Sequence, residues 1–294
     1  MNERLLAIAK KLRKKPMSLL GLGLILFFGL AAALAPVLAP PPPNARDAYI
    51  IPQEGYSPDP VRPSAKHWFG TTEQQYDLYY GMIWGTRTAF KVALSVVLVS
   101  LLIGIVVGSL SGFYGGWVDE VLMRFTDVVL AFPDIVLAVV IVAVLGPGLF
   151  KVMISVTLVS WPQYARLLRG DVLAIKEREF VLAARALGAS DTRILSLHIL
   201  PNCIYPLLVL ASLSMGRIVI TAAALSFLGL GAPLGYADWG QLISLSRNWI
   251  LGSSGNAFEY WHTVFIPGFT IFLFVLGWNL LGDALRDILD PRQK

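Results

Sequence analysis

Long runs of apolar residues dominate the chain and predict a membrane protein with six transmembrane helices. The hydrocarbon core of a bilayer is about 30 Å thick and a helix rises about 1.5 Å per residue, so about 20 apolar residues cross it. Two runs, 17–39 and 92–118, carry no charge, and the glycine-rich end of the second indicates an exit into a loop. The other four carry at most one internal charge and span residues 128–149, 152–165, 205–231 and 262–282. The predicted fold class is therefore all-α.

A cleavable signal peptide is the alternative interpretation of the first run. Five basic residues between positions 10 and 15 precede it, and Ala33, Leu34 and Ala35 resemble a small-residue cleavage site. The apolar core of a signal peptide has about 7–15 residues. Because the 17–39 run is longer, a retained transmembrane helix is the preferred interpretation.

Composition excludes an ordinary water-soluble domain. Hydrophobic residues make up 56% of the 294 residues, charged residues only 15%, and the mean hydropathy is +0.66. The net charge of +5 does not indicate nucleic-acid binding, because the basic residues gather at the ends of apolar runs rather than on one polar face. The single cysteine, Cys203, excludes an intramolecular disulfide, and no Cys/His spacing suits a structural zinc site.

The distribution of Lys and Arg predicts that both termini are cytoplasmic. With the N-terminus inside, the cytoplasmic segments hold 16 of these residues and the outer segments hold 7, in agreement with the positive-inside rule. The predicted parts are a cytoplasmic N-terminus, a first helix, a Pro-rich extracytoplasmic segment, a five-helix core and a cytoplasmic C-terminus, at residues 1–16, 17–39, 40–87, 88–282 and 283–294. Within the core, a cytoplasmic loop spans 167–204 and an outer loop spans 232–261.

Both outer segments have a distinctive composition. Eight prolines between positions 40 and 63 exclude a continuous helix in the first half of the 40–87 segment and predict an extended chain over the outer face. The 232–261 loop is rich in aromatic residues, which predict an interfacial aromatic belt made of Trp239, Trp249, Tyr260 and Trp261.

The cytoplasmic loop predicts two short helices separated by a tight turn. The first covers about 172–187, is rich in good helix formers, and ends at Gly188, which suits a left-handed position after a helix. Ser190 or Asp191 can then cap a second helix that stops before Pro201.

This loop resembles the EAA loop of ABC importer permeases, which docks on the ATPase subunit. Ala183, Ala184, Gly188, Leu200 and Pro201 match the motif. Its acidic position is occupied by a leucine in this chain, and Glu179 is the nearest acid. The resemblance implies an ATPase-coupling site formed by Glu179, Ala183, Ala184, Arg185, Gly188 and Pro201.

Most of the chain resembles the second, C-type permease of dipeptide and oligopeptide importers, a family that also includes nickel permeases. The matching motifs are WFGT at 68–71, RFTD at 124–127, LGPG at 145–148, LSFLGLG at 225–231 and NLLGDALRDILDPR at 279–292. Two departures leave the cargo open. Positions 71–77 contain TTEQQYD where the family has TDxxGRD, and Ala222 replaces an acidic residue.

The resemblance implies a type I ABC importer permease in a bacterial or archaeal cytoplasmic membrane. It further implies a homologous second permease, two cytoplasmic ATP-binding subunits and an extracytoplasmic solute-binding protein as partners in the lipid bilayer. Peptides are the first expectation for the cargo. Nickel complexes, glutathione and other small solutes are the alternatives.

Residues of the translocation pathway are expected around Arg217, Ser226, Phe227 and Asp134. A charge such as Arg217 in an apolar run must face water or a partner. It can meet a carboxylate of the cargo, or it can pair with Asp134 or with the second permease.

The sequence shows no arrangement of residues for catalysis. Its three histidines lie in different loops without a nucleophile nearby, and no phosphate-binding glycine loop is present, so ATP and Mg²⁺ are expected on partner subunits. We therefore predict a non-catalytic subunit without a cofactor. A rival prediction from another class is a secondary transporter that works alone, for which Asp134 would be the only candidate ion site.

Overall fold

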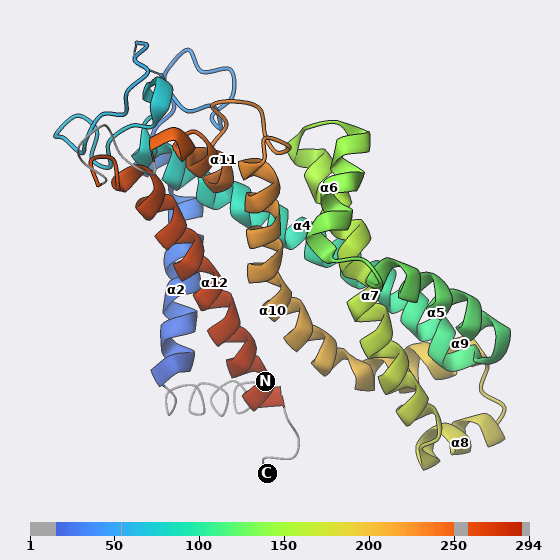
Figure 1. The fold of residues 1–294 in the computed structure, drawn as a ribbon. Coiled ribbons are helices and arrows are strands. Elements are labelled where there is room, and N and C mark those ends of the chain that lie inside the picture. Colours follow the sequence, from blue (N-terminus) through green and yellow to red (C-terminus); the bar gives the residue numbers. More distant parts are fainter. Residues whose placement is uncertain (1–15, 54, 250–257, 290–294) are drawn as a thin grey trace.

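The computed structural model describes residues 16–53, 55–249 and 258–289, which form a bundle of long helices (Figure 1). Its elements are α2 (Pro16–Ala33), α3 (Ala35–Leu38), η1 (Glu73–Gln75), α4 (Leu78–Tyr114), α5 (Gly116–Leu130), α6 (Asp134–Leu145), α7 (Leu149–Lys176), α8 (Glu179–Ala186), α9 (Asp191–Arg193), η2 (Ile194–Ile199), α10 (Leu200–Phe227), α11 (Trp239–Ser244), η3 (Arg247–Trp249) and α12 (His262–Leu289). Besides helices, the described residues form three isolated β-bridges. The all-α prediction is confirmed.

Helices α4 and α7 form the centre of the bundle, and glycine lets them approach closely. Gly104, Gly108 and Gly112 lie one turn apart on α4 and face α7. A β-carbon at Gly108 would lie 2.5 Å from the carbonyl oxygen of Ala165, and one at Gly112 would lie 2.8 Å from Cβ of Val172. Small residues at this spacing are typical of close helix packing in membranes. They hold α7, which leads into the 167–204 loop, firmly against α4.

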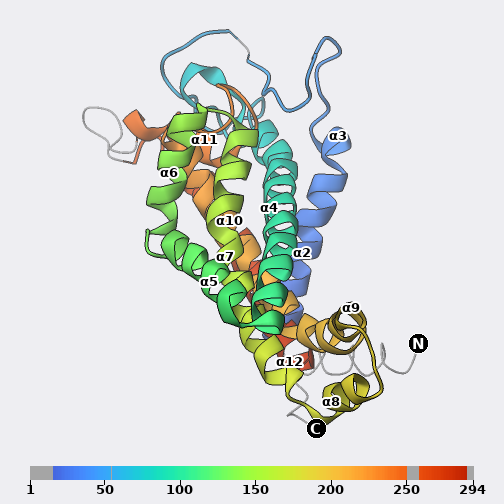
Figure 2. The ribbon, with the colours of Figure 1, turned by 90° about the vertical axis from the view of Figure 1, so that its right-hand side faces the viewer.

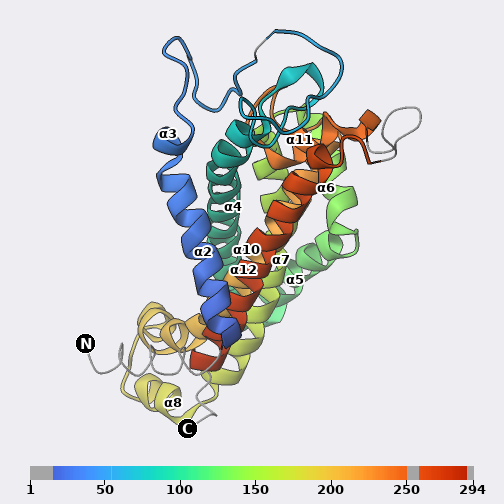
Figure 3. The same ribbon diagram turned by 90° about the vertical axis from the view of Figure 1, so that its left-hand side faces the viewer.

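Helices α2 and α12 lie side by side at one edge of the bundle (Figure 3). The rings of Phe28 and Phe274 lie 6.1 and 5.6 Å from the indole of Trp239. Trp239 is only 3% exposed, because Gly85 on α4 leaves room for its ring. The indole Nε1 of Trp239 donates a hydrogen bond to the carbonyl of Met82 at 3.2 Å. The prediction that Trp239 belongs to an interfacial belt is therefore wrong.

Four helices of the described chain are long and apolar enough to span a membrane, namely α2, α4, α12 and a continuous helix over residues 191–227. The pair α5 and α6 is a fifth candidate, with a bend of 90° between its halves. Helix α7 has 28 residues but does not qualify, because it includes charges such as Lys151, Arg166 and Arg169. Each predicted run overlaps one of these elements, whereas the count of six spans stays a prediction.

The second run belongs to a longer helix than predicted. Helix α4 begins at Leu78 because the side chain of Asp77 caps it, accepting a hydrogen bond from the backbone N–H of Tyr80 at 2.8 Å. The non-helical chain that precedes α4 therefore ends at residue 77, whereas the predicted boundary of the outer segment at residue 87 stays a prediction. At the other end of α4, the predicted loop is a break at Gly115, whose φ of +68° lets the chain turn directly into α5.

The third run, 128–149, is not one helix. Helix α5 ends at Leu130 and α6 begins at Asp134. Pro133 has no backbone N–H and disfavours a helical conformation at Phe132, so the helix breaks there. As a result, Asp134 lies at the start of a helix rather than in the middle of one.

The two ends of the bundle differ in structure (Figures 1 and 2). One end, here called the outer end, carries α11 and the segment 40–77. The other, called the coupling end, carries α8 and α9, together with the start of α2 and the end of α12. The flanks between them expose apolar side chains such as Phe27 (63% exposed) and Val144 (82%), which suits contact with lipid or with other helices.

Candidate functional site

The predicted docking loop lies at the coupling end and is built around the short helix α8. Helix α7 continues to Lys176, after which Glu177 leaves the helical conformation and Arg178 is extended. A single helix over 172–187 is therefore a wrong prediction. The chain turns here because Val181 is fully buried, which fixes α8 against η2.

Gly188 ends α8 in the way the sequence predicts. Its φ is +79°, in the left-handed region. The backbone N–H of Gly188 donates to the carbonyl of Arg185 at 3.0 Å, and that of Ala189 donates to the carbonyl of Ala184 at 3.1 Å. These two bonds define a Schellman motif, so the prediction of a left-handed position at Gly188 is confirmed.

The second half of the loop differs from the prediction, because the helix does not stop before Pro201. Residues Ile194–Ile199 widen into a π-helix, and Pro201 follows this widened turn inside the continuous helix over residues 191–227. The side-chain amide of Asn202 donates to the carbonyl of His198 at 2.7 Å. The loop therefore joins a membrane helix without interruption.

Helix α8 presents apolar and small side chains away from the bundle. Phe180, Leu182 and Leu187 are 47%, 45% and 88% exposed. The predicted coupling residues lie on this helix and its end, with Glu179, Ala183, Arg185 and Gly188 exposed and Ala184 half-buried. Pro201 is also exposed but lies at the far end of the loop. An exposed apolar surface on a rigid helix is suited to docking on a protein partner.

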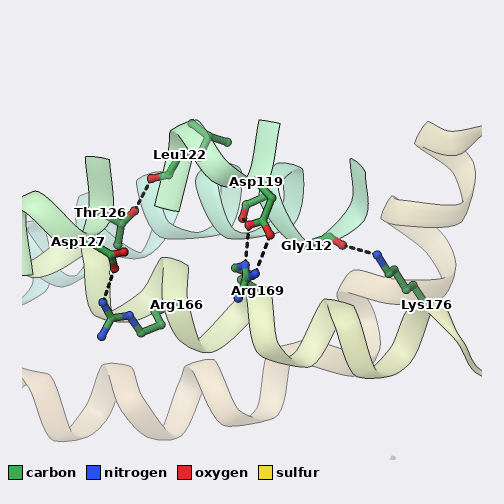
Figure 4. Close-up of polar contacts among 9 residues, drawn as sticks. Gly112, Asp119, Leu122, Thr126, Asp127, Arg166, Arg169 and Lys176 are labelled. Carbon is green, nitrogen blue, oxygen red and sulfur yellow. Dashed lines mark hydrogen bonds and ion pairs between the residues drawn. The ribbon is translucent and has the colours of Figure 1, made fainter. Parts of the chain in front are cut away.

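A cluster of polar contacts ties α5 to α7 beside this loop (Figure 4). Asp119 accepts two hydrogen bonds from Arg169, each 2.6 Å long, and a third from the hydroxyl of Ser111. Lys176 donates to the carbonyl of Gly112 at 3.0 Å, at the end of α4. The sequence analysis missed this cluster. Arg169 is 50 residues from Asp119 in sequence, and Lys176 is 64 residues from Gly112. No local spacing in the sequence therefore indicates the cluster.

Arg217 joins three helices. It donates to Oε1 of Gln163 on α7 at 2.7 Å and lies 3.4 Å from Oδ2 of Asp134 on α6. The side chains of Arg217 and Asp134 remain 41% and 39% exposed. Of the two interpretations of Arg217, the geometry matches the intramolecular pair, and its exposure leaves room for another ligand.

Ser226 and Phe227 lie elsewhere, so the four predicted pathway residues form two groups. Ser226 and Phe227 line a cavity of about 610 Å³ at the outer end, between the end of α10, the turn before α7, and α11. The side chain of Asp238 caps α11 by accepting from the N–H of Gln241 at 2.9 Å. Burial raises the pKa of Asp238 above its ordinary value, and the hydrogen bonds that it accepts offset part of that rise.

Comparison with known proteins identifies the family. Residues 104–294 match the binding-protein-dependent transport system inner membrane components, and residues 5–58 match the N-terminal TM domain of oligopeptide transport permease C. The chain is 40% identical over 285 residues to the dipeptide transport system permease protein DppC of Alkalihalophilus pseudofirmus, covering 97% of this chain and 89% of that protein.

Two further similarities extend this result. The chain is 40% identical over 232 residues to the glutathione transport system permease protein GsiD of Pectobacterium atrosepticum, covering 79% of this chain and 75% of that protein. Its fold is similar to a chain of the inward-facing MetNI methionine ABC transporter, with a TM-score of 0.55 and 20% identity over 72% of this chain and 97% of that one. The chain belongs to the family of binding-protein-dependent transport system inner membrane components, as a C-type permease of the peptide ABC importers.

Proposed function

We propose that this permease forms half of the translocation pathway of an ATP-driven importer of dipeptides and oligopeptides. A homologous second permease forms the other half. Two cytoplasmic ATP-binding subunits bind ATP and Mg²⁺ and drive the cycle, and an extracytoplasmic solute-binding protein delivers the cargo.

The observation that carries this proposal is the rigid connection between α8 and two helices of the bundle. Helix α8 follows α7 after two residues, and after the turn at Gly188 the chain continues as one helix over residues 191–227, through η2 into α10. The exposed face around Phe180, Ala183 and Leu187 can dock on an ATPase subunit. A displacement of α8 by that subunit would therefore move α7 and α10 together.

The mechanism that follows is alternating access. ATP binding closes the ATPase pair, shifts α8, and opens the pathway to a docked solute-binding protein. ATP hydrolysis resets the permease toward the cytoplasm. In this scheme the chain performs no bond chemistry, because its own residues bind, position and transmit movement.

Peptide cargo is proposed because two kinds of relative, named for dipeptide and for glutathione transport, each share 40% identity with this chain. Glutathione is itself a small peptide, so both names describe cargo with amide bonds and charged ends. Nickel complexes and other small solutes are the alternative within the same family.

Reconstitution tests the proposal. The permease pair with its ATPase subunits and binding protein should take up a labelled dipeptide into vesicles only when ATP is present. The chain alone should be inactive. Transport by the chain alone, driven by an ion gradient, would instead support a secondary transporter.

The coupling role has a separate test. Gly188→Leu introduces a side chain at a residue whose φ is +79°, and this side chain lies next to the docking face. The substitution should therefore weaken co-purification of the ATPase or uncouple ATP hydrolysis from uptake. Gly170→Ala on α7 is the matched control, since an added β-carbon meets nothing within 4 Å in either position. Normal ATPase binding and normal uptake in Gly188→Leu would contradict docking at α8.

Orientation is also part of the proposal, with α8 in the cytoplasm. The native Cys203 is fully buried, so it should leave a low background for labelling. In intact cells, an impermeant thiol reagent should label Ser57→Cys and spare Ser190→Cys. The reverse pattern would overturn the orientation.

A further inference from the structure

The cavity of about 610 Å³ at the outer end has the size of a small-molecule site. Its apolar wall includes Phe227, Leu228 and Leu234, and its remaining wall carries polar and charged groups. Neither the proposed docking role of α8 nor the Arg217 cluster uses these groups.

Two opposite charges line the cavity. Glu73 comes from η1 and Arg247 from η3. Oε2 of Glu73 accepts hydrogen bonds from Nε1 of Trp249 at 3.1 Å and from Nδ2 of Asn248 at 3.4 Å, which hold η1 next to η3. Since Asn248 adjoins Arg247 in sequence, both charges belong to the η1–η3 side of the cavity.

The guanidinium of Arg247 is available for a ligand. Within the described part of the chain, Arg247 makes no hydrogen bond and no ion pair, and its side chain is exposed. A guanidinium offers donors in a planar arrangement that matches a carboxylate, so a peptide carboxylate is its natural ligand.

The inner wall of the cavity contains a buried acceptor that needs a donor. Gln241 is 7% exposed, and its Nε2 donates to the carbonyls of Ala232 and Pro233 at 2.7 and 2.6 Å. These two bonds fix the orientation of the amide, so Oε1 remains buried without a partner among the described residues. A buried acceptor without a donor is costly, and a bound N–H group would relieve that cost after a shift of the cavity wall, because Oε1 has less than 1 Å² of accessible surface.

We propose that this cavity is a binding subsite for a small zwitterionic peptide on its way into the membrane pathway. Arg247 binds the C-terminal carboxylate, and Glu73 attracts the N-terminal ammonium. Oε1 of Gln241 accepts an N–H of the peptide, and the apolar wall accommodates a side chain. This inference rests on the proposed peptide cargo and adds the groups by which this chain recognises it.

A photo-crosslinking experiment tests the subsite directly. The probe is a dipeptide of alanine and a diazirine-bearing leucine, added to the complete importer in nanodiscs without its binding protein. Labelling is expected in the 226–248 segment. Excess dialanine should compete with it, whereas N-acetyl-dialanine amide, which lacks both charges, should not.

Two substitutions and a matched control complete the experiment. Arg247→Gln and Glu73→Gln should each reduce labelling about tenfold, as loss of one charge-assisted hydrogen bond predicts. Arg62→Gln should not, because Arg62 pairs with Glu259 at 3.1 Å and does not line the cavity. The amount of assembled complex is measured for every variant.

Several outcomes would overturn the subsite. These are labelling only at residues that do not line the cavity, labelling that dialanine does not displace, and labelling that Arg247→Gln leaves unchanged in assembled complex. Protection of the cavity by empty binding protein, combined with no dipeptide labelling, would make it a docking surface for that protein. ATP-dependent dipeptide uptake by the same importer is measured in parallel, so that failure of the peptide cargo is distinguished from failure of the subsite alone.

Discussion

Two of the arginine–aspartate pairs that connect helices of this permease differ sharply in geometry. At the coupling end, Arg169 and Asp119 share two hydrogen bonds of 2.6 Å, and their side chains are 33% and 19% exposed. In the other pair, Arg217 and Asp134 make a single contact of 3.4 Å, and their side chains are 41% and 39% exposed. The shorter bond of Arg217, at 2.7 Å, goes to the neutral Gln163.

The comparison separates a fixed connection from one that can rearrange. A guanidinium that meets a carboxylate with two parallel hydrogen bonds is held in place and contributes most of its interaction energy to that pair. Arg169 therefore fixes α5 to α7 next to the docking loop. Arg217 keeps donors unused and has a weak hold on Asp134, so it can exchange partners when the pathway opens or when an anionic group arrives.

The largest effect is expected from breaking the fixed pair. Asp119→Asn removes the charge that accepts both bonds from Arg169 and leaves the guanidinium half-buried without a counterion. Since a hydrogen bond to a charged group contributes about 1.5–3 kcal/mol, we expect a loss on the order of 2 kcal/mol. The measurement is thermal unfolding of the purified complex, with uptake measured alongside.

A charge exchange distinguishes the pair from a local effect of the substitution. Asp119→Arg combined with Arg169→Asp should restore part of the lost stability, whereas each single change should be worse than Asp119→Asn. A double variant no better than the single ones would mean that the pair itself is not the source of the effect.

Sequence patterns predict those features of this chain that depend on neighbouring residues. Gly188 was predicted correctly because a helix end, a left-handed residue and the following cap are all local chemistry. Asp134 and Arg217 are candidate functional residues in the sequence because each is a charged residue within an apolar run. The bend at Pro133, in contrast, was missed because the apolar pattern continues across it, although a proline there is a local signal.

Other features depend on contacts that no local pattern contains. Asp119 and Arg169 are 50 residues apart, and the sequence around either residue does not indicate the other. Glu73 and Trp249 are 176 residues apart. Trp239 matched the composition of an interfacial belt, but Gly85 on another helix makes the space that buries it. Such features require the tertiary structure, because the partner decides the role of the residue.

The next largest effect is expected at the rearranging pair, and it should appear in transport rather than in stability. If Arg217 meets an anionic group during transport, Arg217→Ala should reduce uptake about tenfold, the cost of one charge-assisted hydrogen bond. Complex assembly and basal ATPase activity should remain close to those of the wild type. Loss of assembly would show that Arg217 is structural after all.

A smaller effect is expected from the partner of Arg217. Asp134→Asn removes a contact of 3.4 Å, which is longer than a well-formed N–H···O hydrogen bond, and leaves the bond to Gln163 intact. We therefore expect stability to change by less than about 1 kcal/mol. Uptake kinetics and unfolding are measured as before. An effect as large as that of Asp119→Asn would remove the distinction between the two pairs.

The smallest effect is expected from a third pair, Arg166 and Asp127, which also joins α7 to α5 but lies at the surface. Its contact is short, at 2.7 Å, yet the side chains are 56% and 54% exposed (Figure 4). Exposed pairs contribute about 0–1 kcal/mol because solvent screens them and ordering two long side chains opposes the gain. Arg166→Gln should therefore leave unfolding of the complex within about 0.5 kcal/mol of the wild type. A loss as large as that of Asp119→Asn would mean that the second permease or an ATPase subunit covers this side of α5 and α7 in the assembled importer. In that case, contact distance would decide which pairs are fixed, and exposure in the single chain would not.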